Sequence, residues 1–237
     1  MLQSIKRLYG NKLGALDGEI GHVKDFYFDD QNWAVRYVVV DTGSWLTGLQ
    51  VLISPHAFGG FHHAGSFLCV NLTRKQIENS PSIESHKPVS RQYEEEYYQY
   101  YGWPNYWEGN GLWGWSGIPL MEPPIISLPI DPIKESRKHH KRADAHLRCT
   151  QAVTGYHIQA SDGPIGKVCD FMMDDQRWVI RQLVANIGHL LESDEVQIPT
   201  EKVDRISYEE SKVFVNLTRK SIEKDPSHPL ILDGALD

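Results

Sequence analysis

Three histidines close together are the residues whose types and spacing come nearest to a metal site. His56, His62 and His63 lie in a glycine-rich stretch, HAFGGFHH. Three imidazoles and a water are a common catalytic zinc shell. However, no carboxylate or thiol stands at a supporting spacing, and an internal repeat of this region, described below, carries no histidine at the matching positions. The sequence therefore predicts a loop cluster without a metal.

Two acidic turns, Asp29-Asp30 and Asp174-Asp175, raise the question of calcium. A calcium loop of the EF-hand type needs oxygen ligands at alternate positions, a central glycine and a closing glutamate. That pattern is missing around both pairs. Aspartate favours turns because its side chain bonds to nearby backbone amides, and this explains the pairs without a metal.

The cysteines Cys69, Cys149 and Cys169 are odd in number and show no CxxC spacing. They indicate reduced thiols in a cytoplasmic protein rather than a disulfide framework. Cys69 and Cys169 lie in strand-like stretches and are expected to act there as small hydrophobic residues. Arg148 stands next to Cys149 and would lower the pKa of its thiol, but no base partner is evident. No nucleophile elbow, phosphate loop, GxGxxG or HExxH motif is present. We expect no catalytic residue, no cofactor and no enzyme activity.

Charge and hydropathy exclude further classes. Thirty-one acidic against 24 basic residues give a net charge of -7, which argues against nucleic-acid binding. No run of about 18 apolar residues exists to span a membrane. The N-terminal residues lack the apolar stretch of a signal peptide. These features favour the cytoplasm.

An internal duplication organises the chain. DGEIGHVKDFYFDDQNWAVR starts at Asp17, and DGPIGKVCDFMMDDQRWVIR starts at Asp162, 145 residues later. The same offset relates VNLTRKQIENSP, from Val70, to VNLTRKSIEKDP, from Val215. A single offset over this length indicates two copies of one structural unit.

Each copy is expected to be rich in β-strands. In the first copy the predicted strands cover residues 23–28, 33–40, 50–53 and 67–71, and the second copy repeats the first two at 168–173 and 178–185. Gly21 within such a stretch indicates a bulge or a close backbone approach. Thr73 and Gln76 form a capping box before a short helix that Pro81 ends. Short strands with glycine corners and one helical turn predict a small β-barrel with a thin core, which pairing would stabilise.

The residues between the copies are dominated by aromatics and then by prolines. Ten Tyr and Trp residues lie between Tyr93 and Trp115. Four of the tyrosines have helical spacing and predict an amphipathic helix beginning near Ser90. Five prolines between Ile118 and Pro132 predict an extended connector.

Three interpretations of the aromatic residues stay open. They form a clasp that packs on the two units, a surface for a partner or a second copy, or a membrane-interface anchor. A Glu triplet beside them opposes binding to an anionic membrane. The predicted partner-binding residues are Tyr97, Tyr101, Trp103, Trp107, Trp113 and Trp115.

Two sets of basic residues have unassigned roles. Residues 134–148 carry six Lys and Arg against two acids, and we interpret them as a solvated connector; phosphates, an acidic partner or the acidic faces of the units themselves are the alternatives. Arg36 and Arg181 recur after the repeated Trp and are expected to pair with Asp25 or Asp170 across a sheet.

The stretch DGEIGHVKDFYFDDQNWAVRYVVVDTGSWLTGLQVLISP, from Asp17 to Pro55, resembles the PRC-barrel family, whose namesake is the cytoplasmic domain of the bacterial photosynthetic reaction-centre H subunit. The matching features are the DGxIGxVxD block, the acidic turn, the WxxRY strand, the DTGxW corner and the VLISP strand. The second copy keeps the opening block but differs at the DTG corner. The resemblance implies small barrels that act as docking modules, with no shared catalytic residues.

Together these observations predict an all-β bacterial protein with two tandem PRC-type barrels. The expected ranges are a first barrel at 1–81, an aromatic and proline-rich linker with a basic end at 82–149, and a second barrel at 150–237. The expected function is a non-catalytic cytoplasmic scaffold or adaptor that binds a protein partner and forms a homodimer. The alternative is a peripheral cytoplasmic subunit of a membrane photosynthetic or electron-transfer complex, like the reaction-centre H subunit.

Overall fold

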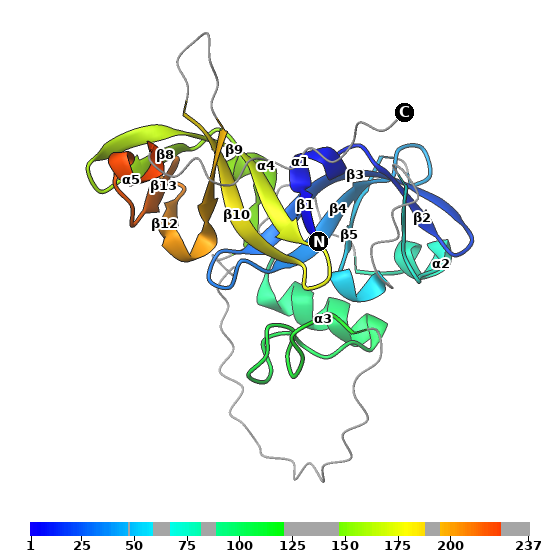
Figure 1. Cartoon of the computed structure of the whole chain (residues 1–237). Coiled ribbons are helices and arrows are strands. Elements are labelled where there is room, and N and C mark those ends of the chain that lie inside the picture. The colour runs from blue at the N-terminus through cyan, green and yellow to red at the C-terminus, as the bar shows by residue number, and fades with distance from the viewer. Residues whose placement is uncertain (47, 59–66, 82–88, 121–146, 188–194, 224–237) are drawn as a thin grey trace.

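The computed structural model describes residues 1–46, 48–58, 67–81, 89–120, 147–187 and 195–223. The fold is mostly β, with two sheets that lie side by side and one longer helix beneath the first (Figure 1). His62, His63, most of the proline-rich connector and residues 134–146 of the basic stretch lie outside the described residues.

The first sheet is built mainly from the first copy of the repeat. Its strand order is β5-β4-β3-β2-β6, with β7 paired to β3. The strands are β2 (Lys12–Ala15), β3 (Gly18–Asp29), β4 (Val35–Asp41), β5 (Gln50–Ile53), β6 (Phe67–Cys69) and β7 (Leu147–Cys149). The short helices that accompany it are η1 (Pro55–Ala57), α2 (Arg74–Glu78) and α4 (Thr150–Val153).

The second sheet repeats this arrangement with the order β11-β10-β9-β8-β13-β12, and β1 pairs with β9. Its strands are β1 (Leu2–Ser4), β8 (His157–Ala160), β9 (Gly163–Asp174), β10 (Val179–Asn186), β11 (Glu195–Pro199), β12 (Val203–Ser207) and β13 (Lys212–Val215). The helices on this side are α1 (Ile5–Leu8), η2 (Thr200–Lys202) and α5 (Arg219–Glu223).

The two sheets exchange their first strands. β1 pairs with β9 in the second sheet, while β7, its counterpart 145 residues later, pairs with β3 in the first. The following helical turns contact the same strands, α1 on β9 and α4 on β3. Each sheet therefore contains a strand from the other half of the chain, and one hydrophobic cluster runs through both.

The two acidic turns meet where the halves join. Trp33 and Trp178 adopt left-handed backbone conformations with φ of 59° and 56°. The amide of Val35 donates to the carbonyl of Trp178, and the amide of Ile180 donates to the carbonyl of Trp33, both at 2.8 Å. Because each Trp completes its turn, the strands begin at Val35 and Val179, so the predicted starts at 33 and 178 were early.

Several local predictions are confirmed. A Cβ on Gly21 would lie 2.0 Å from the Asp41 carbonyl oxygen, so this position requires glycine for the close approach of two strands. The Thr73–Gln76 capping box is present at α2. Closure into barrels is not shown, because within the described residues both strand orders are open.

Candidate functional site

The aromatic residues form an ordered element, which we call the aromatic clasp (residues 90–118). Its helix, α3 (Arg91–Tyr101), begins as predicted at Ser90, whose hydroxyl accepts the amide of Tyr93, and ends at Gly102 with φ of 71°. Only glycine adopts that conformation without strain, so the chain turns back there towards the first sheet. The helix and the loops after it cover one side of the first sheet (Figure 1).

Tyrosines fasten the clasp to β5. The Tyr97 hydroxyl donates to the Leu52 carbonyl and accepts the Ser54 amide, both at 3.0 Å. Tyr98 is also fully buried, and its hydroxyl lies 3.4 Å from that of Ser54. Burial raises the pKa of both tyrosines well above the ordinary value, so they stay neutral and act as fixed hydrogen-bonding groups.

A buried carboxylate joins the clasp to β4. Glu94 is fully buried and accepts hydrogen bonds from Tyr37 at 2.9 Å and Tyr106 at 2.8 Å. The guanidinium of Arg91, one helical turn earlier, lies 3.1 Å from its other oxygen. A buried charge persists only when it is paired and hydrogen-bonded, and Glu94 meets that condition through three partners.

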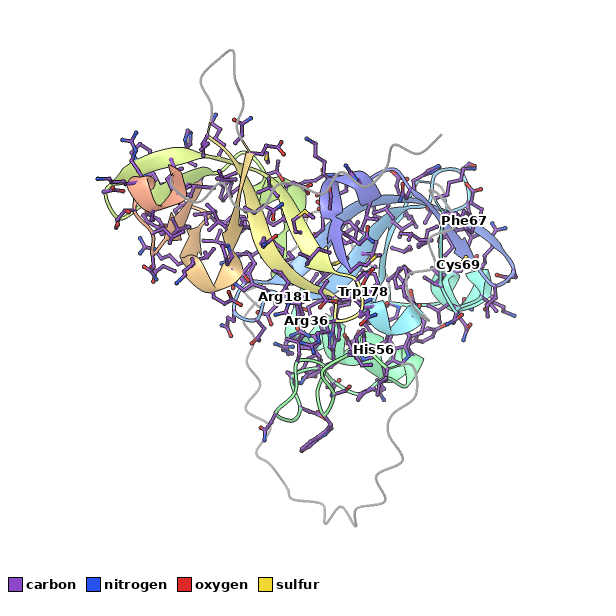
Figure 2. All side chains as sticks on the ribbon, viewed as in Figure 1. Arg36, His56, Phe67, Cys69, Trp178 and Arg181 are labelled. Atoms are coloured by element: carbon purple, nitrogen blue, oxygen red, sulfur yellow. The ribbon has the colours of Figure 1, made fainter. Side chains whose placement is uncertain are left out.

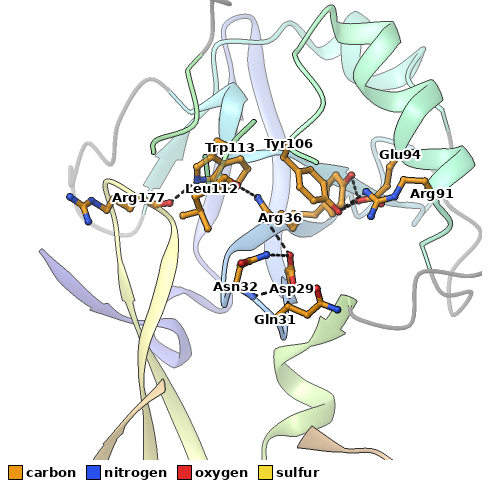
Figure 3. A network of polar contacts seen from close by, with 11 residues as sticks. Asp29, Gln31, Asn32, Arg36, Arg91, Glu94, Tyr106, Leu112, Trp113 and Arg177 are labelled. Carbon is orange, nitrogen blue, oxygen red and sulfur yellow. Dashed lines mark hydrogen bonds and ion pairs between the residues drawn. The ribbon is translucent and has the colours of Figure 1, made fainter. Parts of the chain in front are cut away.

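Arg36 is at the centre of the polar network (Figure 3). This arginine of β4 is buried, with its guanidinium 3.2 Å from Asp29 and donating to the Leu112 carbonyl at 2.7 Å. The rings of Tyr106 and Trp113 stack on it, at 3.8 and 4.9 Å from its central carbon. Burial alone would raise the pKa of Asp29, but Arg36 and the hydrogen bonds of the turn hold it below its usual value.

His56 lies on the same face, where Figure 2 labels it beside the clasp. Its ring stacks on Trp103 at 5.5 Å and meets Trp113 edge-on at 5.2 Å, and Nδ1 lies 3.1 Å from the Ser54 hydroxyl. Burial, with the nearby charge of Arg36, lowers the pKa of His56 to about 4. The imidazole is therefore neutral at pH 7 and part of the packing.

The prediction that Arg36 and Arg181 pair with Asp25 or Asp170 was wrong. Arg36 pairs with Asp29 and Arg181 with Asp174, because each arginine folds back onto the turn of its own copy. Asp25 and Asp170 instead bind the exchanged segments. Asp170 accepts the Ser4 hydroxyl at 2.5 Å and the Lys6 amide at 2.9 Å, while Asp25 accepts the Thr150 hydroxyl at 2.7 Å and the Gln151 amide at 3.1 Å.

The environment of the cysteines also differs from expectation. Cys149 donates its thiol proton to Asp25. Burial, together with that carboxylate, raises the pKa of Cys149 to about 12, so the thiol does not show the lowering that Arg148, its neighbour in the sequence, could cause. Arg148 turns away and pairs with Asp30 at 2.6 Å. Cys69 was expected to act as a small core residue, yet it is exposed at the edge of the first sheet (Figure 2).

The six predicted partner-binding residues divide by exposure. Tyr97, Trp103 and Trp113 are buried in the clasp, and Tyr101 and Trp107 are partly buried. Trp115 is 70% exposed. The structure thus brings the six into one element, and five of them serve mainly to pack it.

The polar partners of the clasp were not apparent from the amino-acid sequence. Arg36 carried a signal, because it recurs after the repeated Trp, and His56 was considered only as a metal ligand. Glu94 had no distinguishing signal beside Glu95 and Glu96. In the part of the chain that the structure describes, no three His, Cys, Asp or Glu side chains are grouped to hold a metal ion, and no helix has the length and apolarity to cross a membrane.

Comparison with known proteins adds no assignment: no protein family matches the chain, and no curated protein is similar enough to count as a match.

Proposed function

We propose that this protein is a non-catalytic assembly protein, built from two PRC-barrel-like units, that binds other polypeptides. The carrying observation is the clasp itself. One face of the first sheet holds a Tyr- and Trp-rich segment by stacking its rings on Arg36, whose guanidinium also donates a hydrogen bond to a backbone carbonyl of that segment. Such stacking on a desolvated guanidinium is a recurrent mode of protein recognition.

The surface available for binding is the outer end of the clasp together with the residues that directly follow it. Trp115, Ile118 and Leu120 are exposed, at 70%, 42% and 36%. Tryptophan is enriched among the residues that dominate binding energy at interfaces. The arginines Arg177 and Arg181 line a cleft of about 410 Å³ next to Ile118 and give this apolar surface a polar border.

Affinity capture tests the proposal. The full chain, Trp115→Ala and a matched control, Leu16→Ala, are immobilised and exposed to extract from the source cells. Leu16 is a suitable control because it is 68% exposed, close to the 70% of Trp115, and lies outside the clasp, in the turn between β2 and β3. We expect a defined set of proteins to be retained by the wild type and by Leu16→Ala and lost from Trp115→Ala. Identical retention by all three would refute the proposal.

The peripheral subunit of a membrane complex is kept as an outcome of the same experiment. Capture of membrane-complex subunits, with release at high salt, would place the binding at a charged membrane-side surface. Nothing in the described residues favours it over assembly through Trp115.

A further inference from the structure

The internal repeat supplies counterparts of the three positions that hold Trp113, two in the second copy and one in the turn between β3 and β4. Trp113 stacks on Arg36, meets His56 edge-on and donates its indole N–H to the Arg177 carbonyl at 2.9 Å. The 145-residue offset relates these positions to Arg181, Glu201 and Asn32. Figure 3 shows two of the first set, Arg36 beside Trp113 and Arg177 reaching Trp113 from the turn of the other half.

All three counterparts line a single cleft of about 590 Å³, which we call the turn cleft. That volume lies within the range of about 300–1,000 Å³ typical of small-ligand sites. Buried Trp33, Val179 and Thr200 also line it, and Arg181 lies at its side. The cleft thus offers the buried apolar side chains of Trp33 and Val179, a guanidinium to stack on and a turn whose carbonyl groups can accept an indole N–H. Its lining also carries charged side chains, Asp30, Glu201, Asp204 and Arg205.

The state of the two arginines differs as this comparison requires. The side chain of Arg36 is 2% exposed and 3.2 Å from Asp29, whereas that of Arg181 is 38% exposed and 4.0 Å from Asp174. Trp113 and Tyr106 cover the first guanidinium. The second lines the turn cleft with its side chain accessible to a ring.

We propose that the turn cleft binds the Trp115 side chain of a second copy of this chain. Trp115 lies two residues after Trp113, so the same segment offers one indole to its own first sheet and one outwards. The loop is held by Gly111 N to Gly114 O at 2.6 Å and Trp113 N to Ser116 O at 2.9 Å. A side chain presented by a fixed loop loses little conformational freedom on binding.

The arrangement is reciprocal. Each copy carries one exposed Trp115 and one turn cleft, so a two-fold axis lets both copies donate and receive an indole. Such an isologous dimer closes on itself and leaves neither group unused. This inference rests on the proposed function, since it names the partner of the same Trp115 surface.

The experiment is sedimentation velocity of the full chain over a concentration series from micromolar to hundreds of micromolar. We expect a monomer–dimer equilibrium whose dissociation constant rises at least about tenfold in Trp115→Ala and in Arg181→Ala. Two exposed controls, Leu16→Ala and Arg7→Ala, should leave it unchanged. Far-UV circular dichroism checks that every variant is folded.

Mixing the variants gives the sharper test. Trp115→Ala retains an intact cleft and Arg181→Ala retains an intact Trp115, so an equimolar mixture regains one of the two contacts. We expect the mixture to dimerise more strongly than either variant alone. Lack of such recovery, a wild type that stays monomeric, or a dimer that ignores both substitutions would each overturn the inference.

The two proposals fail separately. If Trp115 captures a different protein while the chain remains monomeric, the assembly function stands and the turn-cleft assignment falls. If the dimer forms and responds as described but captures nothing else, the assignment stands and the wider function falls.

Discussion

The two halves of this molecule start from closely similar sequences and reach different states at the same position. In the first, Arg36 and Asp29 form a buried pair under the rings of the clasp. In the second, Arg181 and Asp174 are partly exposed and 4.0 Å apart. The repeat explains what they share, and the clasp explains how they differ.

The comparison shows that a repeated residue does not have a repeated energetic role. Water screens the Arg181 pair, whereas the clasp removes water from the Arg36 pair and supplies an aromatic environment. The duplicated unit therefore provides the same arginine-containing surface on each sheet. The segment that covers this surface decides whether the arginine is buried in the structure or available for binding.

Removing the two arginines should give the largest contrast. Arg36→Met leaves the Asp29 carboxylate buried without its partner, so we expect a loss of about 3–5 kcal/mol in the free energy of unfolding. Arg181→Met breaks an exposed pair and should cost no more than about 1 kcal/mol. Urea denaturation followed by circular dichroism measures both. Equal losses of unfolding free energy in the two variants would mean that burial does not distinguish the Arg36 pair from the Arg181 pair.

The two tryptophans of the clasp should differ almost as much. Trp113→Ala opens a cavity beneath the loop and removes the hydrogen bond to Arg177, which predicts a loss of about 3–5 kcal/mol. Trp115→Ala removes an exposed ring and should change stability by about 0.5 kcal/mol or less. The same denaturation curves test this pair, and a stability loss in Trp115→Ala comparable to that of Trp113→Ala would contradict the assignment of Trp115 to the surface.

Acid should affect the first half through His56, which the second half lacks. The pKa of His56 is lowered from 6.5 to about 4, so below pH 6.5 the unfolded chain takes up a proton that the folded chain refuses. The contribution of the neutral His56 ring to the free energy of unfolding is complete above pH 6.5 and is lost as the pH falls towards 4. A lowering of this size corresponds to about 3 kcal/mol.

His56→Asn provides the control, because it keeps a polar side chain near Ser54 without a titrating ring. Its free energy of unfolding should fall less steeply than that of the wild type between pH 6.5 and 4. Parallel curves would show that His56 takes up its proton in the folded state as easily as in the unfolded one.

The exchanged strands should show the halves at their most alike. Asp25→Asn and Asp170→Asn each weaken the hydrogen bonds to the segment that arrives from the other half, and each should cost about 1–3 kcal/mol. Thermal unfolding compares them directly. A much larger loss for one variant would mean that the two exchange contacts are not energetically equivalent.

Local features were accessible from the sequence because local chemistry decides them. Ser90 and Thr73 cap helices through hydrogen bonds within one turn. Position 21 requires glycine because two strands approach closely there. The tyrosine spacing predicted α3 correctly. The start of the strand after Trp33 was misplaced, because its left-handed conformation is stabilised by contact with the opposite turn.

The candidate site was only partly accessible. The six aromatic residues were found as a set, but composition does not tell a buried ring from an exposed one, and only packing separates Trp113 from Trp115. The roles of Glu94 and His56 depend on partners far away in the sequence. Asp25 and Asp170 stood out as repeated acids, yet nothing local indicates that each binds the N-terminal segment of the other copy.

The amino-acid sequence by itself determined the duplication, the turns, the helix caps and the amphipathic α3, since each depends on residue type and short spacing. Tertiary structure alone decided that the copies exchange their first strands. It also decided that the clasp covers the surface around Arg36 and leaves the surface around Arg181 accessible. Those outcomes depend on which surfaces meet and on the water they exclude. Identical residues at two repeated positions do not show which surface covers each of them.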